Sequence, residues 1–215
     1  MLNINVDTSA LLGAVKNFKQ ETKTDRVFFR EDSAFAMKCE GFFKALEGLA
    51  QSREGDTLTV VDKSLYNGNE SPVEWTIRKE DVLAILDNTK VGLFGNILKK
   101  ECEKGLLVTT KGLFALNVFD GTPTKSGFLS WNTVANCTKM GGTAGEYSVQ
   151  LFTEWKGIQG RFRKGPRVFF WFENAKIKNV GTKLEKLINH LKFIAKGSPG
   201  EFDNDEYAPD YSVEG

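Results

Sequence analysis

The sequence contains few of the side chains from which most enzyme and metal sites are built. His190 is the only histidine among 215 residues, and the three cysteines, Cys39, Cys102 and Cys137, form no CxxC spacing. A zinc site, or a Ser-His or Cys-His catalytic pair, needs more of these ligands and bases than the chain supplies. We therefore expect no metal, no cofactor and no catalytic residue, and we interpret the chain as a non-enzyme.

Long apolar runs are missing as well. The run VFFWF at 168–172 falls far short of the ~20 residues that a membrane helix requires, and the first twenty residues lack the pattern of a signal peptide. The chain is 40% hydrophobic and 27% charged, which excludes a wholly disordered or low-complexity protein. These observations predict a soluble, cytoplasmic protein without a transmembrane segment.

Charge is divided unevenly along the chain although its formal total is only +1. Residues 1–98 carry a net charge of −3, residues 99–196 carry +10, and residues 197–215 carry −6 without a single Lys or Arg. The last block, which we name the acidic tail (197–215), is rich in Gly, Pro, Ser and Asp, so we expect it to be disordered. It either keeps the protein soluble or folds back over the basic block and competes with that block's ligand.

The first 84 residues alternate between helical and extended patterns. Asp7, Thr8 or Ser9 can cap a helix over 9–22, and Asp32 or Ser33 can cap a second helix in which Cys39 occupies a core position. The remaining elements that we expect in this region are strands at 26–30, 57–66 and 73–78, the last two forming a hairpin, and a short helix over 79–88.

From about residue 105 the pattern becomes strand-like. Glycine-rich turns separate successive β-rich runs, and a final amphipathic helix over 178–196 carries an apolar stripe from Val180 to Ile194 that we place on the strands. His190 lies off that stripe, so we expect it to be at the surface or half-buried. The strands expected here are 105–110, 112–119, 127–134, 147–155 and 167–174.

The run KGLLVTTKGLFALN, followed by GFLSWNTV, resembles the bacterial pleckstrin-homology-like (PH-like) domains, which often carry a similar strand-turn-strand and a tryptophan-containing strand. The resemblance covers roughly residues 85–196. Thr110 stands where the family often has Asp, and fewer strands are recognisable than a full barrel of this type has. The resemblance implies a binding or assembly module without catalytic residues, and it transfers no ligand residues.

The segment KGIQGRFRKGPR (156–167) is the candidate functional site. Clustered guanidinium and ammonium groups on a glycine-punctuated loop suit phosphate or another anion, although a solvated hairpin tip has the same composition. Phe162 among them offers a surface that can stack on a base or enter lipid headgroups. The candidate anion-binding residues are Lys156, Arg161, Arg163, Lys164 and Arg167.

Together these patterns predict an α+β fold. A small helical and hairpin N-terminal region (1–84) is followed by a mostly antiparallel PH-like β-barrel or sheet closed by a C-terminal amphipathic helix (85–196), and then by the acidic tail. The expected function is a non-catalytic binding or assembly module that recognises a protein partner or an anionic surface. The alternative is a nucleic-acid-binding or inhibitory accessory protein that uses the basic loop, and an anionic lipid headgroup is a further possible ligand.

Overall fold

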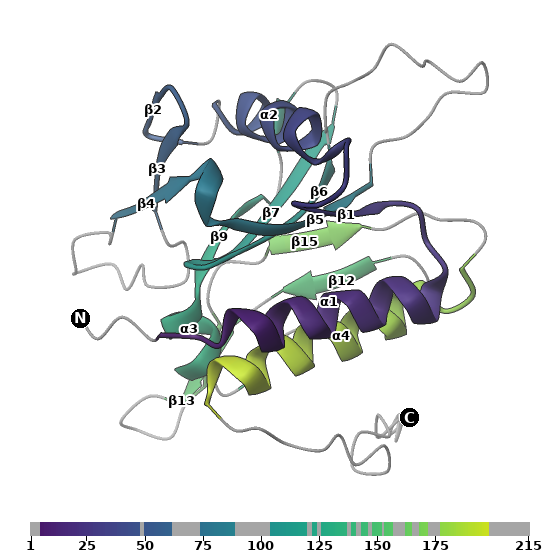
Figure 1. The fold of residues 1–215 in the computed structure, drawn as a ribbon. Coiled ribbons are helices and arrows are strands. Elements are labelled where there is room, and N and C mark those ends of the chain that lie inside the picture. Colours follow the sequence, from purple (N-terminus) through teal and green to yellow (C-terminus); the bar gives the residue numbers. More distant parts are fainter. Residues whose placement is uncertain are drawn as a thin grey trace, which may run out of the picture.

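The chain has an α+β architecture in which every strand pairing is antiparallel among the described residues. No pairing within that part of the chain closes a barrel. The structure, a computed structural model (Figure 1), describes residues 5–47, 50–61, 74–88, 104–119, 122–123, 126–136, 139–140, 143–145, 148–151, 153–156, 162–164, 168–171 and 177–197. Except for Gly197, the acidic tail lies outside them. None of the helices in these ranges combines the length and apolarity that crossing a bilayer requires.

A central sheet organises the fold. Its strands follow the order β1-β5-β6-β7, and both β8 and β9 pair with β7. The expected boundary between residues 84 and 85 falls inside β5, so strands from both sides of that boundary belong to one sheet. The bounds are Val27–Phe29 for β1, Val82–Asp87 for β5, Lys104–Thr109 for β6, Gly112–Phe119 for β7, Thr122–Pro123 for β8 and Gly127–Ser130 for β9.

The prediction of a short helix over 79–88 is wrong. A single 3-10 turn, η2 (Lys79–Asp81), leads directly into β5, and all six residues of β5 are buried. A strand in the middle of a sheet that is covered on both faces needs apolar side chains on both sides, so its residues form a continuous run. Over so short a length such a run cannot be told from a buried helix by its periodicity.

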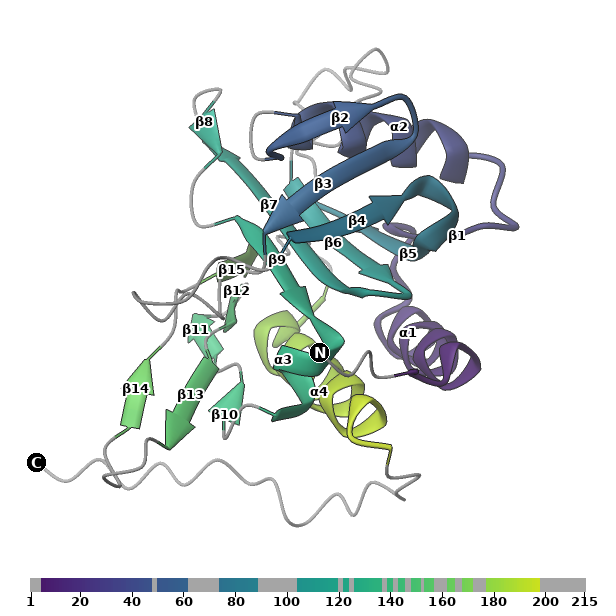
Figure 2. The same cartoon turned by 90° about the vertical axis from the view of Figure 1, so that its left-hand side faces the viewer.

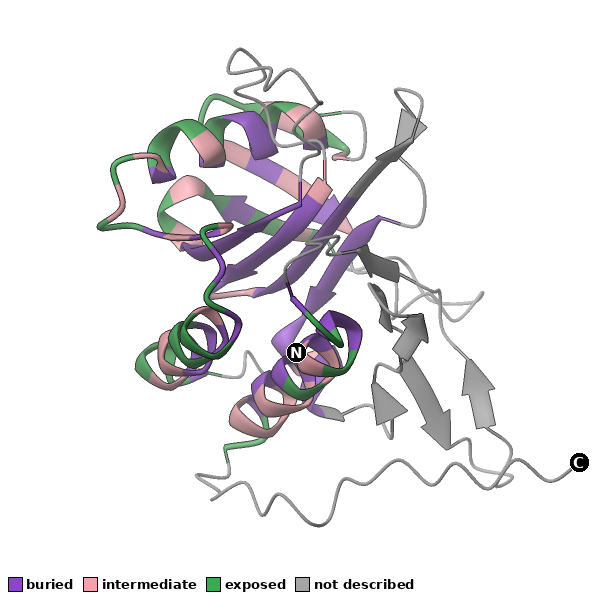
Figure 3. Cartoon of the chain, turned by 90° about the vertical axis from the view of Figure 1, so that its right-hand side faces the viewer, coloured by how far each residue is buried: buried purple, intermediate pink, exposed green. Residues whose placement is uncertain are grey.

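Opposite faces of the sheet pack into two separate cores. Leu106 and Val108 belong to the core beside α1, α3 and α4, whereas Leu107 between them belongs to the core beside α2 and β3 (Figures 1 and 3). This alternation follows from the two-residue period of a strand. The bounds are Thr8–Thr22 for α1, Phe35–Leu46 for α2, Trp131–Asn136 for α3, Val180–Ala195 for α4, Ser52–Glu54 for β2, Thr57–Val61 for β3 and Glu74–Arg78 for β4.

The two N-terminal helices begin in different ways. The Asp7 carboxylate accepts hydrogen bonds from the backbone N–H groups of Ser9 (2.9 Å) and Ala10 (3.1 Å), which confirms Asp7 as the cap of α1. The predicted cap of α2 at Asp32 or Ser33 is wrong, because the cap position is Ala34 and has no side-chain hydrogen bond. Asp32 instead accepts from the Phe29 N–H (2.8 Å) and closes the turn after β1.

The hairpin that carries the PH-like resemblance forms β6 and β7, joined at Lys111. The Thr109 hydroxyl oxygen accepts hydrogen bonds from the N–H groups of Lys111 (3.1 Å) and Gly112 (2.9 Å). A Cβ atom at Gly112 would lie 2.2 Å from the carbonyl oxygen of Leu129, so only glycine fits where β7 meets β9.

The strand expected over 127–134 ends early. Strand β9 stops at Ser130, whose hydroxyl accepts from the Thr133 N–H (3.2 Å), and α3 begins at Trp131. Trp131 is 1% exposed, and its indole N–H donates to the Thr109 carbonyl (2.9 Å). The tryptophan therefore locks α3 onto the β6–β7 turn instead of extending the sheet.

The remaining strands form three further sheets, in the orders β2-β3-β4, β10-β13-β14 and β11-β12-β15 (Figure 2). The antiparallel pairing of β3 with β4 confirms the predicted hairpin. The single strand expected over 147–155 is thus two strands that belong to different sheets. Helix α4 contacts β11 and β12, as its stripe predicts, and also contacts α1 and α3. The bounds are Lys139–Met140 for β10, Thr143–Gly145 for β11, Ser148–Leu151 for β12, Thr153–Lys156 for β13, Phe162–Lys164 for β14 and Val168–Trp171 for β15.

The docking of α4 can be tested with two neighbouring substitutions. Leu187 is 4% exposed within the core, whereas Lys186 is exposed. We expect Leu187→Ala to lower the free energy of unfolding by roughly 2–5 kcal/mol and Lys186→Ala to change it by less than about 0.5 kcal/mol. Equal small effects in a denaturant titration would contradict the docking.

Candidate functional site

The predicted basic loop is partly a β-hairpin. Lys156 is the last residue of β13, and Arg163 and Lys164 lie in β14, whose pairing sets Trp155 opposite Arg163 and Glu154 opposite Lys164. Arg161 and Arg167 lie outside the described residues. Three of the five predicted cations therefore share one two-stranded ribbon, and an acidic residue stands in register with one of them.

A second candidate site is a groove between α1 and α4, of about 290 Å³. The two helices lie side by side and run in opposite directions under the central sheet (Figures 1 and 2). Each contributes four residues at the spacing i, i+3, i+4 and i+7, which places them on one helix face. The lining residues, which we name the α1–α4 groove, are Ala14, Asn17, Phe18 and Glu21 from α1, and Lys183, Lys186, Leu187 and His190 from α4.

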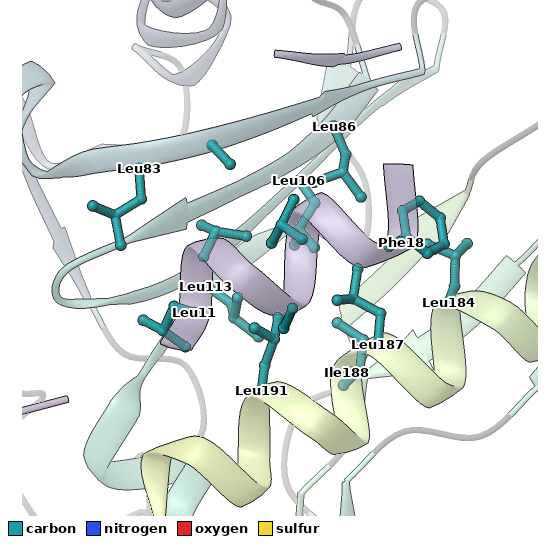
Figure 4. Close-up of a cluster of buried hydrophobic side chains, with 14 of the residues drawn as sticks. Leu11, Phe18, Leu83, Leu86, Leu106, Leu113, Leu184, Leu187, Ile188 and Leu191 are labelled. Atoms are coloured by element: carbon teal, nitrogen blue, oxygen red, sulfur yellow. The ribbon is translucent and has the colours of Figure 1, made fainter. Parts of the chain in front are cut away.

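The floor of the groove is apolar and belongs to the core. Ala14, Phe18 and Leu187 are each 4% exposed, and they form part of the cluster that joins both helices to the sheet (Figure 4). Because these side chains are held by core packing on their inner sides, the floor is preformed. It presents only small apolar patches to a ligand, because each of these side chains is almost fully buried, but no ordering cost is needed to form them.

The rim carries charges that have no partner within the described part of the chain. Lys183, Lys186 and Glu21 make no ion pair there. Some cations elsewhere are paired: Lys38 lies 2.5 Å from the buried carboxylate of Asp87, and Lys19 lies 3.5 Å from the partly exposed carboxylate of Asp32. Others, such as Lys111 and Lys178, make no ion pair among the described residues either. The two groove lysines thus keep their full capacity to donate hydrogen bonds to an anion.

The opposite directions of α1 and α4 determine where the charged residues lie along the groove. Because α1 and α4 run antiparallel, Glu21 and Lys183 share one end, and Ala14 and His190 share the other. The carboxylate of Glu21 therefore offsets the field mainly at the Lys183 end. An anionic ligand is favoured towards Lys186, in the stretch between the two ends.

His190 is half-buried, as the sequence predicts. Burial lowers the pKa of its imidazole below the ordinary value of 6.5, because desolvation disfavours the charged ring. At neutral pH the groove therefore contains a neutral imidazole beside the two ammonium groups.

Other charged and nucleophilic clusters serve the fold. Arg53 reaches Glu40 (2.8 Å) and Glu47 (2.5 Å) and so fastens β2 to α2. Cys39 is buried in the α2 core, and this burial raises the pKa of its thiol to about 11, which keeps it protonated and unreactive. Its predicted core role is confirmed. Among the described residues, no group of three or more His, Cys, Asp or Glu side chains is arranged to hold a metal ion.

Comparisons of the chain with protein-family models, with curated proteins and with solved structures found no match. The function of the chain must therefore be inferred from the chemistry of the groove and of the β13–β14 hairpin.

The lowered pKa of His190 gives the stability of the protein a defined pH dependence. Between that lowered pKa and 6.5 the unfolded chain binds the proton more readily, so the free energy of unfolding falls as the pH drops through this window. Urea titrations of the wild type and of His190→Gln at pH 7.5 and 5.5 test this. We expect the loss on acidification to be smaller in His190→Gln, and equal losses would contradict the assignment.

Proposed function

We propose that the protein is a non-catalytic binding module and that the α1–α4 groove receives a segment of a protein partner. One observation supports this most strongly: an apolar, preformed floor lies beneath two lysines that have no ion-pair partner among the described residues.

The shape of the groove favours a partner segment that inserts one or two side chains. Two packed antiparallel helices leave a valley in which a helix or an extended segment can lie, with apolar anchors on the floor and polar groups at the rim. A volume of about 290 Å³ holds only the anchoring side chains of such a segment, which is typical of an interface centred on a hot spot.

The rim selects the charge of the partner. Lys183 and Lys186 favour Asp or Glu next to the apolar anchors, and Asn17 adds an amide that can donate to or accept from a backbone group. The partner segment that we propose therefore combines aromatic or aliphatic residues with carboxylates.

The PH-like resemblance agrees with this proposal, because it implies a binding or assembly module. Of the residues that carry the resemblance, the first run forms β6 and β7, whereas the second forms β9 and then helix α3, which begins at Trp131. We therefore also propose that the chain is related to the PH-like domains and that it acts in the cytoplasm.

The basic hairpin β13–β14 favours the second candidate function. The pairing of Lys156 with Phe162, and of Trp155 with Arg163, brings basic and aromatic residues into register on one ribbon. This composition suits a phosphate backbone with stacked bases, so an accessory protein that binds nucleic acid is the alternative.

Photo-crosslinking from the groove distinguishes the two functions. A benzophenone amino acid is placed at Asn17, on the groove rim, or at Gln20, an exposed position of α1 that does not line the groove. In native extract, we expect Asn17 but not Gln20 to yield a protein crosslink. Lys183→Glu with Lys186→Glu should weaken it by about tenfold, because charge-assisted contacts are lost.

The matched control reverses two lysines outside the groove, Lys44 on α2 and Lys178 before α4, and should leave the crosslink intact. A crosslinked species that nuclease removes would favour the nucleic-acid alternative. No crosslink at Asn17, or equal crosslinks at Asn17 and Gln20, would contradict the groove as the binding site.

A further inference from the structure

We infer that the acidic tail of the same chain is a ligand of the α1–α4 groove and competes there with the protein partner. This inference rests on the proposed function of the groove as the receptor for an acidic, partly apolar segment. It adds the identity of one such segment and the regulation that follows from it.

The charges of the tail and the groove are complementary. The tail carries six carboxylates and no basic residue, so its only electrostatic complement is a cationic surface. Lys183 and Lys186 have no ion-pair partner among the described residues, and they belong to the helix that precedes the tail. Attraction between such exposed groups is screened within about 8–10 Å at physiological salt, so proximity in the chain matters.

The tail starts close to the groove. The last residue of the groove on α4, His190, is separated from Gly197 by about 10 Å of helix, and Lys183 by about 21 Å at 1.5 Å per residue. The eighteen residues from 198 to 215 span up to about 60 Å when extended, so the tail can return along the whole groove.

The end of α4 favours a change in chain direction. Gly197 adopts the left-handed conformation (φ 73°), and its N–H donates to the carbonyl of Ile194 (2.9 Å). A left-handed glycine at this position ends a helix and turns the chain away from the helix axis. Pro199 follows two residues later and prevents the helix from resuming.

The side chains of the tail fit the groove chemically. Its acids are interspersed with aromatic residues in the sequence EFDNDEYAPDY (201–211). An aromatic ring can lie on the floor formed by Ala14, Phe18 and Leu187 while a neighbouring carboxylate meets Lys186. Phe202, Tyr207 and Tyr211 are the candidate anchors.

Covalent linkage gives the tail an advantage over a free partner. A tethered segment reaches an effective concentration in the millimolar range, so even weak contacts keep the groove occupied. The tail is then displaced from the groove only by a partner that binds more tightly, or when the charge of the tail changes. The tail thus sets a threshold for binding.

The test uses a fluorescein-labelled peptide of residues 198–215, with its binding to full-length protein followed by fluorescence anisotropy. In the tail-neutral variant the six acids become amides: Glu201→Gln, Asp203→Asn, Asp205→Asn, Glu206→Gln, Asp210→Asn and Glu214→Gln. We expect the tail-neutral protein to bind the peptide at least about tenfold more tightly than the wild type, in which the intact tail competes.

Two further variants separate the groove from general charge attraction. Both are made in the tail-neutral protein and have the same net charge: Lys183→Glu with Lys186→Glu, and Lys44→Glu with Lys178→Glu. The groove pair should abolish peptide binding, whereas the control pair should retain it. Near-UV circular dichroism of each variant verifies that the fold is intact.

The inference is overturned if the tail-neutral protein does not bind the peptide, if it binds no more tightly than the wild type, or if both lysine pairs weaken binding equally. Crosslinking of a protein partner at Asn17 is measured separately. If a protein partner still crosslinks at Asn17 while the peptide results are negative, the proposed function of the groove is retained. Only the tail is then excluded as a ligand of the groove.

Discussion

The packing of α1 against α4 beneath the central sheet is the contact on which the remaining structure depends. These helices come from opposite ends of the described chain, and their buried residues share one core with β1, β5, β6, β7 and β9. Without that contact, one face of the sheet would lose its apolar cover. The same contact creates the groove, because four residues of each helix line it.

Charged groups that neutralise a buried charge differ from the lysines at the groove rim, which are available to a ligand as other surface lysines such as Lys178 are. Asp87 is fully buried and has Lys38 at 2.5 Å, as a buried carboxylate requires. Lys183 and Lys186, by contrast, stand at the rim of the α1–α4 groove without an ion pair among the described residues. They are not needed to neutralise a buried charge, so their capacity to bind an anion is available for a ligand.

Much of the fold could be predicted from local sequence signals. Asp7 marks the start of α1 because a short carboxylate can cap the first turn, and glycine-rich turns mark the hairpins. Strand β5 could not be predicted, because a run buried on both faces has no period of its own. The early end of β9 could have been predicted, because serine is a common helix cap. The hydroxyl of Ser130 accepts a hydrogen bond from the Thr133 N–H and so caps α3.

The candidate site was harder to predict from the sequence than the fold. The basic segment 156–167 is visible as a local cluster, whereas the groove joins residues 14–21 to residues 183–190. Each stripe by itself resembles the ordinary border between the buried and exposed sides of an amphipathic helix. Only the packing of α1 against α4 brings the two stripes together. That packing depends on the sheet formed by the strands that lie between the two helices in the sequence.

A double-mutant cycle between Phe18 and Leu187 measures the α1–α4 contact most directly. If the two side chains pack together, the effects of Phe18→Ala and Leu187→Ala on the free energy of unfolding should differ from additivity by about 0.5–3 kcal/mol. Phe18→Ala combined with Leu58→Ala, a residue of the other core, should be additive within about 0.5 kcal/mol. Additive effects for Phe18 and Leu187 as well would contradict the packing from which both the fold and the groove are derived.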